Sequence, residues 1–419
     1  MFFQHIYDKT LAQASYLLGC QKTGEAIVID AKRDVDTYVE IARQNNLRIT
    51  HITETHIHAD FLSGSRELAA LTNAELYLSE EGGPDWQYKF NHKGLRHGDI
   101  LKIGNLSLKV LHTPGHTPES ITFLLTDHPA SNEPVMIFTG DFVFVGDIGR
   151  PDLLEKAAGI KGTQEIGAEQ MYESIQQFKA LPDFIQVWPG HGAGSACGKA
   201  LGAVPSTTVG YEKIRNWALQ YGENKPGFID YLLSDQPEPP RYFAQMKMRN
   251  KEPRNLLTQV PKHQKVSPEV VLHALQNGVN VIDTRHKSLY EKGFIPGTIN
   301  IQNNNSLATW AGWFLNYDNP FLIIAEEKNM DDITRKLMRI GLDNIMGYIE
   351  NVNWYEENGY KLQVSSIVDA TFVENALKNK EIELFDVRGI TEYQDGHIPG
   401  AKHLFLGTLP ENLEHLPKE

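Results

Sequence analysis

The sequence predicts a multidomain α/β protein, on the basis of three observations. Residues 1 to about 240 alternate short apolar runs with loops marked by Gly and Pro, which is typical of a mixed α/β domain with many strands. Residues 234–240 include three prolines, so this stretch cannot continue a helix or a central strand. After the break, a short α/β motif occurs twice. A length of 419 residues suits about two to four domains of roughly 100–200 residues each.

Within the first domain, apolar runs bounded by turn residues predict six strands, at 26–30, 47–52, 106–111, 121–125, 135–138 and 184–187. Periodicity and a low content of Gly and Pro predict helices at 34–44 and 169–178. Asp34 is expected to be the N-cap of the first of these helices.

The repeated motif joins an Asp-x-Arg triplet to a Gly-x-Ile-Pro-Gly turn. Asp283 precedes Gly293 by the same ten positions that separate Asp386 from Gly396. A helical segment and an apolar strand come before each copy, at 268–276 and 279–282, and at 371–378 and 382–385. We therefore divide the chain into a first domain (1–240), a linker (241–263), a first repeat (264–362) and a second repeat (363–419).

Composition excludes several classes of function. The net charge is −13, from 53 acidic and 40 basic residues, and such a chain repels phosphate backbones and anionic lipids. We therefore expect no nucleic acid or membrane partner. No apolar run approaches the ~18 residues of a membrane span, and the sequence after Met1 does not resemble a signal peptide, so we expect a cytoplasmic protein.

The cysteine content limits the choice of metal ligands. Cys20 and Cys197 are the only cysteines, which excludes a disulfide framework and a Cys-rich zinc or iron–sulfur site. Any metal must therefore be held mainly by His and carboxylate side chains.

Four predicted strands of the first domain are followed by loops that carry such side chains. They are His56, His58 and Asp60 after the first, His116 after the second, Asp141 after the third and His191 after the fourth. Because strand ends meet at one edge of a sheet, these groups can converge there. A single loop histidine could equally be a surface or capping residue. Four such loops in register favour a metal site for Zn, Fe or Mn.

These residues resemble the signature of the metallo-β-lactamase superfamily. The resemblance covers residues 1 to about 240 and implies an αββα sandwich with the metal at one edge. The family's ligands correspond to His56, His58, Asp60, His116, Asp141 and His191. One position departs from the pattern, because the family's next His, a ligand of its second metal, is Phe61 here. A phenyl ring cannot coordinate a metal, which argues against a dinuclear zinc hydrolase.

Within this superfamily, the chain most resembles the persulfide dioxygenases. The resemblance implies one ferrous iron held by His56, His116 and Asp141, a facial triad that leaves positions for a persulfide sulfur and O₂. His58, Asp60 and His191 would then orient ligands or solvent. The implied substrate is a low-molecular-weight persulfide of glutathione, coenzyme A, cysteine or a similar thiol, and the implied product is sulfite.

Two further residues are candidates for substrate binding. Arg150 could neutralise an anionic substrate, or it could form a structural pair with a carboxylate such as Asp152. Cys197 lies in the Gly-rich loop after His191, where Lys199 could favour its thiolate and a role in relaying sulfur. A plain free thiol is the alternative for Cys197.

The repeats resemble rhodanese domains, which carry sulfane sulfur on a cysteine after a central strand. In the first copy the predicted strand 321–325 is followed by Glu326 and Glu327, so we expect an inactive domain with a docking or oligomerising role. In the second copy the cysteine loop would fall beyond Glu419, so we expect this domain to be incomplete here and the native chain to continue. A complete copy could convert sulfite to thiosulfate in sulfide detoxification. We also expect a homo-oligomer.

Two other functions stay open at this point. One is a zinc-dependent thioester hydrolase of the glyoxalase II type. The other is a non-catalytic carrier or sensor of sulfane sulfur built on the repeats, which the low cysteine count disfavours.

Overall fold

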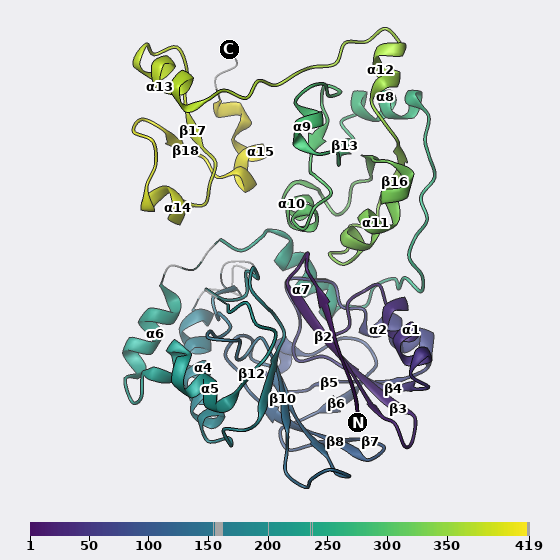
Figure 1. The fold of residues 1–419 in the computed structure, drawn as a ribbon, viewed down its shortest axis with the longest axis vertical. Coiled ribbons are helices and arrows are strands. Elements are labelled where there is room, and N and C mark those ends of the chain that lie inside the picture. Colours follow the sequence, from purple (N-terminus) through teal and green to yellow (C-terminus); the bar gives the residue numbers. More distant parts are fainter. Residues whose placement is uncertain (154, 156–161, 200, 235, 237, 417–419) are drawn as a thin grey trace. The chain divides into compact units, whose positions relative to one another are not determined.

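A computed structural model describes residues 1–419 except 154, 156–161, 200, 235, 237 and 417–419. The chain divides into two compact units (Figure 1). The first comprises residues 1–261 with Met338–Gly341, and the second comprises 262–337 with 342–419.

The first unit contains two six-stranded sheets. One has the order β1-β2-β3-β4-β5-β6, and the other has the order β12-β11-β10-β9-β8-β7. The strands of the first sheet are β1 (Phe2–Asp8), β2 (Gln13–Cys20), β3 (Glu25–Ile29), β4 (Arg48–Thr53), β5 (Glu75–Ser79) and β6 (Lys93–Leu95). Those of the second are β7 (Ile100–Ile103), β8 (Leu106–His112), β9 (Ile121–Asp127), β10 (Met136–Gly140), β11 (Gln186–Pro189) and β12 (Thr207–Thr208).

Helices cover the outer face of each sheet (Figure 1). They are α1 (Asp36–Gln44) and α2 (Ser65–Thr72) on the first sheet, and α4 (Thr163–Lys179), α5 (Val209–Arg215) and α6 (Lys225–Leu233) on the second. Short 3₁₀ turns lie at η1 (Pro84–Trp86) and η2 (Trp217–Gln220).

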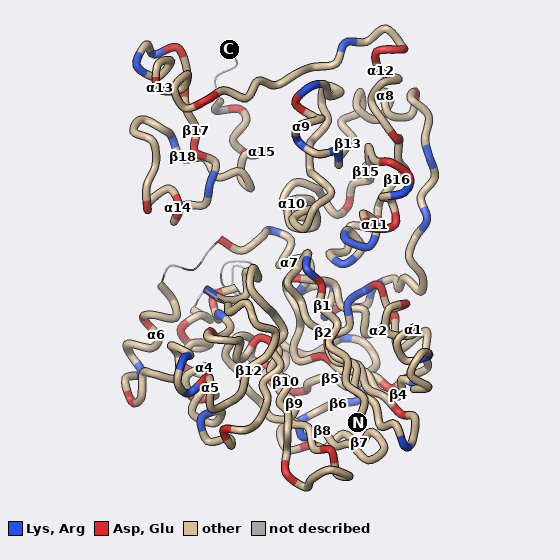
Figure 2. Tube along the Cα trace, viewed as in Figure 1, with Lys and Arg blue, Asp and Glu red and all other residues tan. Residues whose placement is uncertain are grey.

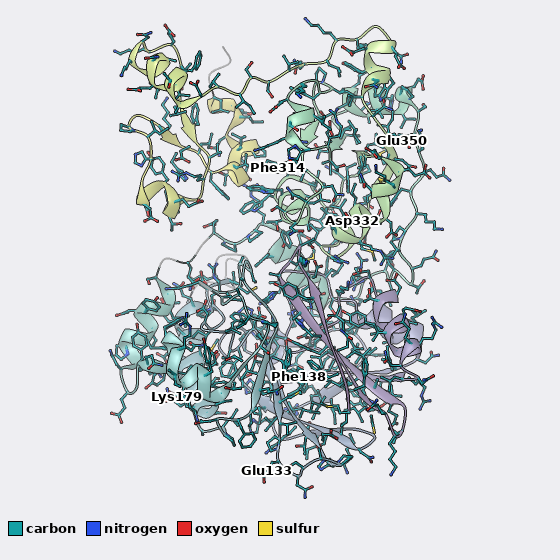
Figure 3. The ribbon with its side chains drawn as sticks, in the orientation of Figure 1. Glu133, Phe138, Lys179, Phe314, Asp332 and Glu350 are labelled. Carbon is teal, nitrogen blue, oxygen red and sulfur yellow. The ribbon has the colours of Figure 1, made fainter. Side chains whose placement is uncertain are left out.

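Three separate apolar cores hold these layers together. The α1 and α2 side chains Tyr38 and Leu68 pack on the first sheet, and α4 packs on the second through Met171. A third core lies between the sheets and includes Phe138 of β10, which is fully buried (Figure 3). A helix–sheet–sheet–helix arrangement needs these three interfaces, so the predicted αββα sandwich and the α/β fold class are confirmed.

Two local predictions were wrong. Phe184 was placed in a strand, but its side chain is 60% exposed and β11 begins at Gln186. Asp34 was expected to cap the first helix, but the N-cap is Val35, which makes no side-chain cap bond. The Asp34 carboxylate instead accepts from Arg339 Nε and Nη2 at 2.9 and 2.6 Å, with the Lys32 ammonium 3.2 Å away, so it is engaged elsewhere.

The segment expected to be a linker contains a helix, α7 (Tyr242–Lys251). The helix packs into the first unit through the buried side chains of Tyr242, Phe243 and Met246. These apolar residues lie at spacings of one and four, which place them on one helical face. Residues 235 and 237 of the proline-rich break lie outside the described residues.

The second unit begins with a four-stranded parallel sheet of order β14-β13-β15-β16. Its strands are β13 (Asn280–Asp283), β14 (Ile299–Asn300), β15 (Phe321–Ile324) and β16 (Ile345–Ile349). Its helices are α8 (Pro268–Gln276), α9 (Lys287–Tyr290), α10 (Leu307–Phe314), η3 (Glu327–Asn329), α11 (Met330–Met338) and α12 (Asn353–Glu357). The rest of the unit contains α13 (Ala370–Lys378), β17 (Phe385–Asp386), α14 (Ile390–Asp395), β18 (Lys402–His403), η4 (Leu406–Thr408), α15 (Leu409–Asn412) and η5 (Leu413–His415).

The repeated motif has the same structural role in both copies. Arg285 forms an ion pair with Asp283 at 2.6 Å, and its Nη2 also donates to the Gly293 carbonyl at 3.0 Å. Arg388 pairs with Asp386 at 2.6 Å and donates to the Gly396 carbonyl at 2.8 Å. The guanidinium thus ties the strand end to the following turn, which explains why the spacing from Asp to Gly is constant.

Charges of both signs are distributed along the chain (Figure 2). Lys and Arg positions alternate with Asp and Glu positions in both units, so the net charge of −13 is not confined to one segment. No helix among the described residues is both long enough and apolar enough to span a membrane.

The fold makes a prediction about Gly140, at the end of β10. Gly140 has a φ of 51°, and a Cβ there would lie 2.3 Å from Thr55 Oγ1. We expect Gly140→Ala to lower the free energy of unfolding by about 3 kcal/mol, through backbone strain plus overlap. Gly98→Ala is the control, because Gly98 has a φ of 89° but open space around its Cβ position, so it should lose only about 1 kcal/mol. Equal losses in urea denaturation would contradict this account.

Candidate functional site

The candidate site lies where strands from both sheets end. Each of its loops follows a strand, so the rigid sheets fix the positions of the polar side chains. The groups are His56, His58 and Asp60 after β4, His116 after β8, Asp141 directly after β10, and His191 two residues after β11. All six of these residues are buried.

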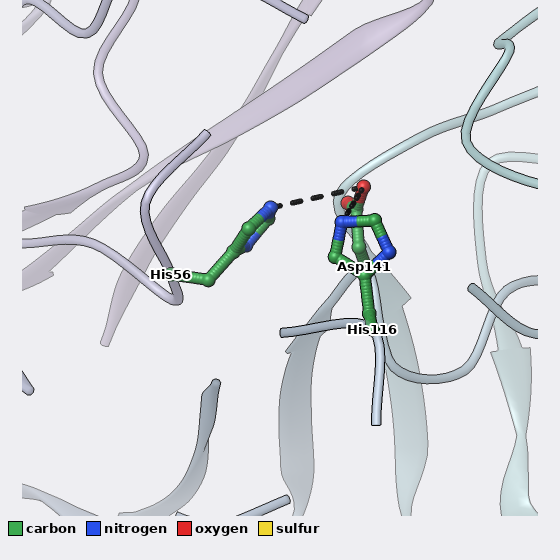
Figure 4. Close-up of side chains that lie close together, drawn as sticks. All are labelled: His56, His116 and Asp141. Carbon is green, nitrogen blue, oxygen red and sulfur yellow. Dashed lines mark ion pairs between the residues drawn. The ribbon is translucent and has the colours of Figure 1, made fainter. Parts of the chain in front are cut away.

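His56, His116 and Asp141 form one compact group (Figure 4). His56 Nε2 lies 3.8 Å from Asp141 Oδ2, and His116 Nε2 lies 3.5 Å from the same oxygen. The three ligand atoms are all within 4.8 Å of one another. This geometry brings together the three residues that were expected to hold a metal.

Hydrogen bonds leave the Nε2 atoms of these two histidines free to coordinate. His116 Nδ1 donates to the Arg150 carbonyl at 2.9 Å, so its lone pair is at Nε2. Thr55 Oγ1 donates its proton to Asp30 Oδ2 at 2.9 Å and can then only accept from His56 Nδ1, which is 3.0 Å away. Both rings therefore point their unprotonated nitrogens toward Asp141.

The electrostatics keep both rings neutral. Burial, followed by the neighbouring His58, lowers the pKa of His56 well below its ordinary value. Burial lowers the pKa of His116 to about 4, although Asp141 opposes the shift. His56 Nε2 and both oxygens of Asp141 are buried without a hydrogen-bond partner among the described residues. Two neutral imidazoles and an unpartnered carboxylate fit a divalent metal ion.

His58 is held differently. Its Nε2 lies 3.0 Å from Asp30 Oδ1, and its ring packs against the Phe61 ring with centroids 4.4 Å apart. Burial favours the neutral form, but the Asp30 carboxylate outweighs it and the pKa of His58 rises to about 9. His58 is therefore an imidazolium in the metal-free protein, and Phe61 supports it from the side.

Asp60, His191 and Cys197 form a second group next to the first. His191 Nε2 lies 3.3 Å from Asp60 Oδ2 and 3.4 Å from Asp141 Oδ1, so Asp141 faces both groups. His191 Nδ1 is 3.0 Å from the Ala12 carbonyl, which anchors the ring to the segment before β2.

The expectation that Lys199 favours a Cys197 thiolate was wrong. The Lys199 ammonium bonds to Ser234 Oγ at 3.2 Å and lies 4.2 Å from the centre of the Tyr231 ring. Cys197 is buried, and burial, followed by the Asp141 and Asp60 carboxylates, raises the pKa of its thiol well above the usual value. The metal-free site therefore holds a neutral thiol.

Arg150 is fully buried, and its guanidinium is engaged by Asp152. Nε and Nη2 donate to the two carboxylate oxygens at 2.7 and 2.6 Å. This is the structural pair that was considered beside a substrate-binding role. The guanidinium is therefore not presented to a ligand, and Arg150 contributes to the site through its backbone carbonyl, which orients His116.

A pocket of about 480 Å³ opens onto His116. Helix α7 supplies much of its wall, including Phe243, Lys247 and Lys251, and Trp86 lies opposite. The Lys247 ammonium is 4.0 Å from the centre of the Trp86 ring. Burial lowers the pKa of Lys247 to about 7, against the influence of Glu119. Sequence reasoning missed this wall because it treated α7 as a linker, although its apolar spacing was a usable signal.

The first repeat has a pocket at the carboxyl ends of β13 and β15, with a volume of about 710 Å³. It is lined by Arg285, Glu326, Glu327 and Lys328 among others, and the sequence after β15 contains no cysteine. A nucleophilic sulfur is therefore not available at this position.

Comparisons with known proteins agree with this architecture. Residues 9–191 match the metallo-beta-lactamase superfamily, and residues 267–361 and 369–419 match the rhodanese-like domain. A crystal structure of a metallo-beta-lactamase from Staphylococcus aureus is 48% identical, with a TM-score of 0.76, and the match covers 83% of this chain and 98% of that one. The chain belongs to the metallo-beta-lactamase superfamily and also carries rhodanese-like domains.

Relatives with assigned activities fall into two groups. The mitochondrial persulfide dioxygenase ETHE1 of Bos taurus is 28% identical over 46% of this chain and 68% of its own length. The hydroxyacylglutathione hydrolase of Nitrosococcus oceani is 33% identical over 42% of this chain and 61% of its own length. Relatives of this chain thus include both an oxidoreductase and a hydrolase.

The geometry around His58 makes a prediction about pH. Folding raises the pKa of His58 from 6.5 to about 9, so the protonated ring stabilises the folded state. This contribution is complete below pH 6.5 and is lost as the pH rises through 9. The full effect corresponds to about 3 kcal/mol. We expect the metal-free protein to lose stability over this range in urea denaturation. Asp30→Asn should flatten the profile, whereas Asp183→Asn, which alters an exposed ion pair, should leave it unchanged. A flat wild-type profile would contradict the assigned ion pair.

Proposed function

We propose that the chain is an Fe(II)-dependent persulfide dioxygenase with a single iron at His56, His116 and Asp141. The observation that carries the proposal is the donor set of two neutral imidazoles and one carboxylate, all buried and directed at one point. This is the ligand combination of non-haem iron oxygenases. The 28% identity to a persulfide dioxygenase supports the same activity.

The proposed reaction oxidises the sulfane sulfur of a persulfide to sulfite. Ferrous iron held by these three side chains would supply open positions at which the persulfide sulfur and O₂ react. The S–S bond breaks and the carrier leaves as a thiol. Both atoms of O₂ end in sulfite, water supplies its third oxygen, and two protons are released.

The protein's own groups would prepare the site for this reaction. The carbonyl of Arg150 and the hydroxyl of Thr55 hold the rings of His116 and His56 in their coordinating tautomers. His58, Asp60 and His191 lie next to the three ligands and would orient ligands or solvent.

The pocket above His116 would receive the thiol carrier. Glutathione, coenzyme A and cysteine all carry carboxylate or phosphate groups, and Lys247 and Lys251 line the pocket wall. Trp86, Phe243 and Met248 would cover the apolar part of the carrier. A low-molecular-weight persulfide with an anionic group suits this combination.

The rest of the proposal concerns the whole chain. We place the dioxygenase domain at 1–240, with α7 of the following segment 241–263 packed into the same unit, an inactive rhodanese-like domain at 264–362 and part of a second one at 363–419. We also propose a cytoplasmic location, in keeping with two free cysteines, and a homo-oligomer assembled through the inactive domain. Transfer of sulfur to sulfite, giving thiosulfate, would require a persulfide-bearing cysteine on a rhodanese domain.

A zinc-dependent thioester hydrolase is the second candidate, favoured by the 33% identity to a hydroxyacylglutathione hydrolase. The two activities need different metals and different substrates, so they can be separated by experiment.

The first functional prediction is oxygen consumption. The iron-loaded chain should consume one O₂ and form one sulfite for each glutathione persulfide, and it should not hydrolyse S-lactoylglutathione. His116→Ala should lower turnover by at least a hundredfold, because it removes one of three protein ligands. His128→Ala is the control, since His128 lies at the surface and bonds to Ser107. Thioester hydrolysis by the zinc-loaded protein, together with no O₂ uptake by the iron-loaded protein, would reject the dioxygenase.

A second functional prediction concerns Lys247. Lys247→Met should raise KM about tenfold with little change in kcat, since a charge-assisted hydrogen bond to the carrier is lost. Because the pKa of Lys247 is about 7, the wild-type KM should rise above pH 7, and the variant should not show this rise. Lys225→Met removes a lysine that pairs with Glu173 on the surface and should change neither constant. An unchanged KM in Lys247→Met would exclude carrier binding at this wall.

A further inference from the structure

Asn250, near the end of α7, is a buried polar side chain with no role in the reaction described so far. Its Nδ2 donates to the carbonyls of His58 and Phe61, each at 2.8 Å. Its Oδ1 accepts from the Ser63 backbone N–H at 2.9 Å. Both amide hydrogens and the amide oxygen are therefore used on one short loop.

This loop, residues 54–64, joins β4 to α2 and carries His56, His58 and Asp60. It contains no helix or strand, so its backbone groups need partners from elsewhere in the fold. Asn250 supplies them on both sides of Asp60. Neither carboxylate oxygen of Asp60 has a hydrogen-bond partner among the described residues, so its position depends on the backbone that Asn250 holds.

Helix α7 also forms the wall of the pocket that opens onto His116. Lys247 and Lys251, at a spacing of four, line this wall. Asn250 lies on the neighbouring, buried face, four residues after Met246. Because a helix moves as a rigid element, the bonds of Asn250 fix the pocket wall relative to the loop.

The energetics of a buried amide explain what an asparagine gives at this position. Burying an amide is costly unless it is hydrogen-bonded, and an apolar side chain of similar shape could pack α7 at little loss of stability. Hydrogen bonds differ from apolar contacts in being directional. Three of them aimed at one loop define its geometry, which apolar packing alone would leave less constrained.

We propose that Asn250 is a positioning residue that sets the distance between the carrier-binding wall of α7 and the metal-binding loop. This inference rests on the proposed function. Asn250 acts through the backbone of the loop, and it would hold a persulfide sulfur, carried on the wall, at the reacting position. A displacement of about 1 Å can cost about a hundredfold in rate, so a side chain outside the reacting groups can control turnover.

Asn250→Ala in the full chain tests the proposal. We expect kcat with glutathione persulfide to fall at least tenfold while KM changes less than about twofold, because Lys247 still binds the carrier. Co²⁺ bound in place of iron should show an altered visible spectrum and a dissociation constant raised about tenfold. In the metal-free protein, amide hydrogen exchange of residues 58–63 should become faster, since the Ser63 bond is lost.

Asn216→Ala is the matched control. Asn216 is fully buried in the first unit, and its side chain also makes three hydrogen bonds, to Asp147, Glu212 and Ala218. This variant should lose similar stability but keep the cobalt spectrum, the exchange of residues 58–63 and both kinetic constants. Equal changes in the two variants would overturn the positioning role, because they would show a general loss of stability.

Asn250→Asp keeps the size of the side chain and an acceptor for Ser63 but removes both donors, so it tests the same bonds even where the alanine variant does not fold. It should also alter the cobalt spectrum. An unchanged spectrum together with an unchanged kcat would overturn the proposal. If the wild-type chain forms no sulfite but the Asn250 variants still alter the spectrum and the exchange, the dioxygenase function is rejected while the control of the loop by Asn250 is supported.

Discussion

The buried carboxylate of Asp141 is the constraint on which the site depends. It follows directly after β10, at the junction of the two sheets, and it faces three histidines while neither of its oxygens has a hydrogen-bond partner among the described residues. A glycine in a neighbouring loop leaves space for this carboxylate. A Cβ at Gly190 would lie 2.7 Å from Asp141 Oδ1, so only glycine allows the loop before His191 to pass this close. The fold thus concentrates unbalanced negative charge at one point. A bound cation would compensate this charge.

Residues next to the proposed ligands determine the protonation of this site. Asp30 bonds to the Thr55 backbone at 2.7 Å and to its hydroxyl at 2.9 Å, and it also holds His58. One carboxylate outside the ligand set therefore fixes the tautomer of His56 and the charge of His58.

In each of the two repeats, a single guanidinium also makes two connections, because it joins a strand end to a turn. Their shared sequence pattern is explained by this bond, so it indicates a common fold and carries no evidence of catalysis.

Much of the site was predictable because its residues are local signals. His56, His58 and Asp60 lie within five positions, and each of the other candidate residues follows an apolar strand that is recognisable by itself. The wall of the pocket that opens onto His116 was not predicted, since Lys247 and Trp86 are far apart in the sequence and meet only through the packing of α7 within the first unit. The capping role predicted for Asp34 was also wrong, because its carboxylate is engaged by the Arg339 guanidinium, which is distant in the sequence.

The sequence by itself determined the αββα class, the repeat, and the types of side chain at the candidate site, because hydrophobic period and motif spacing are properties of short segments. Only the tertiary structure decided which of these side chains lie close together. Asp141 can face two groups at once because β10 ends between them, and Cys197 joins Asp60 and His191 through the path of a loop. The tertiary structure also decided the protonation of His58 and Cys197. Burial and neighbouring charges shift the pKa of both groups, and the spacing of residues in the sequence does not reveal these shifts.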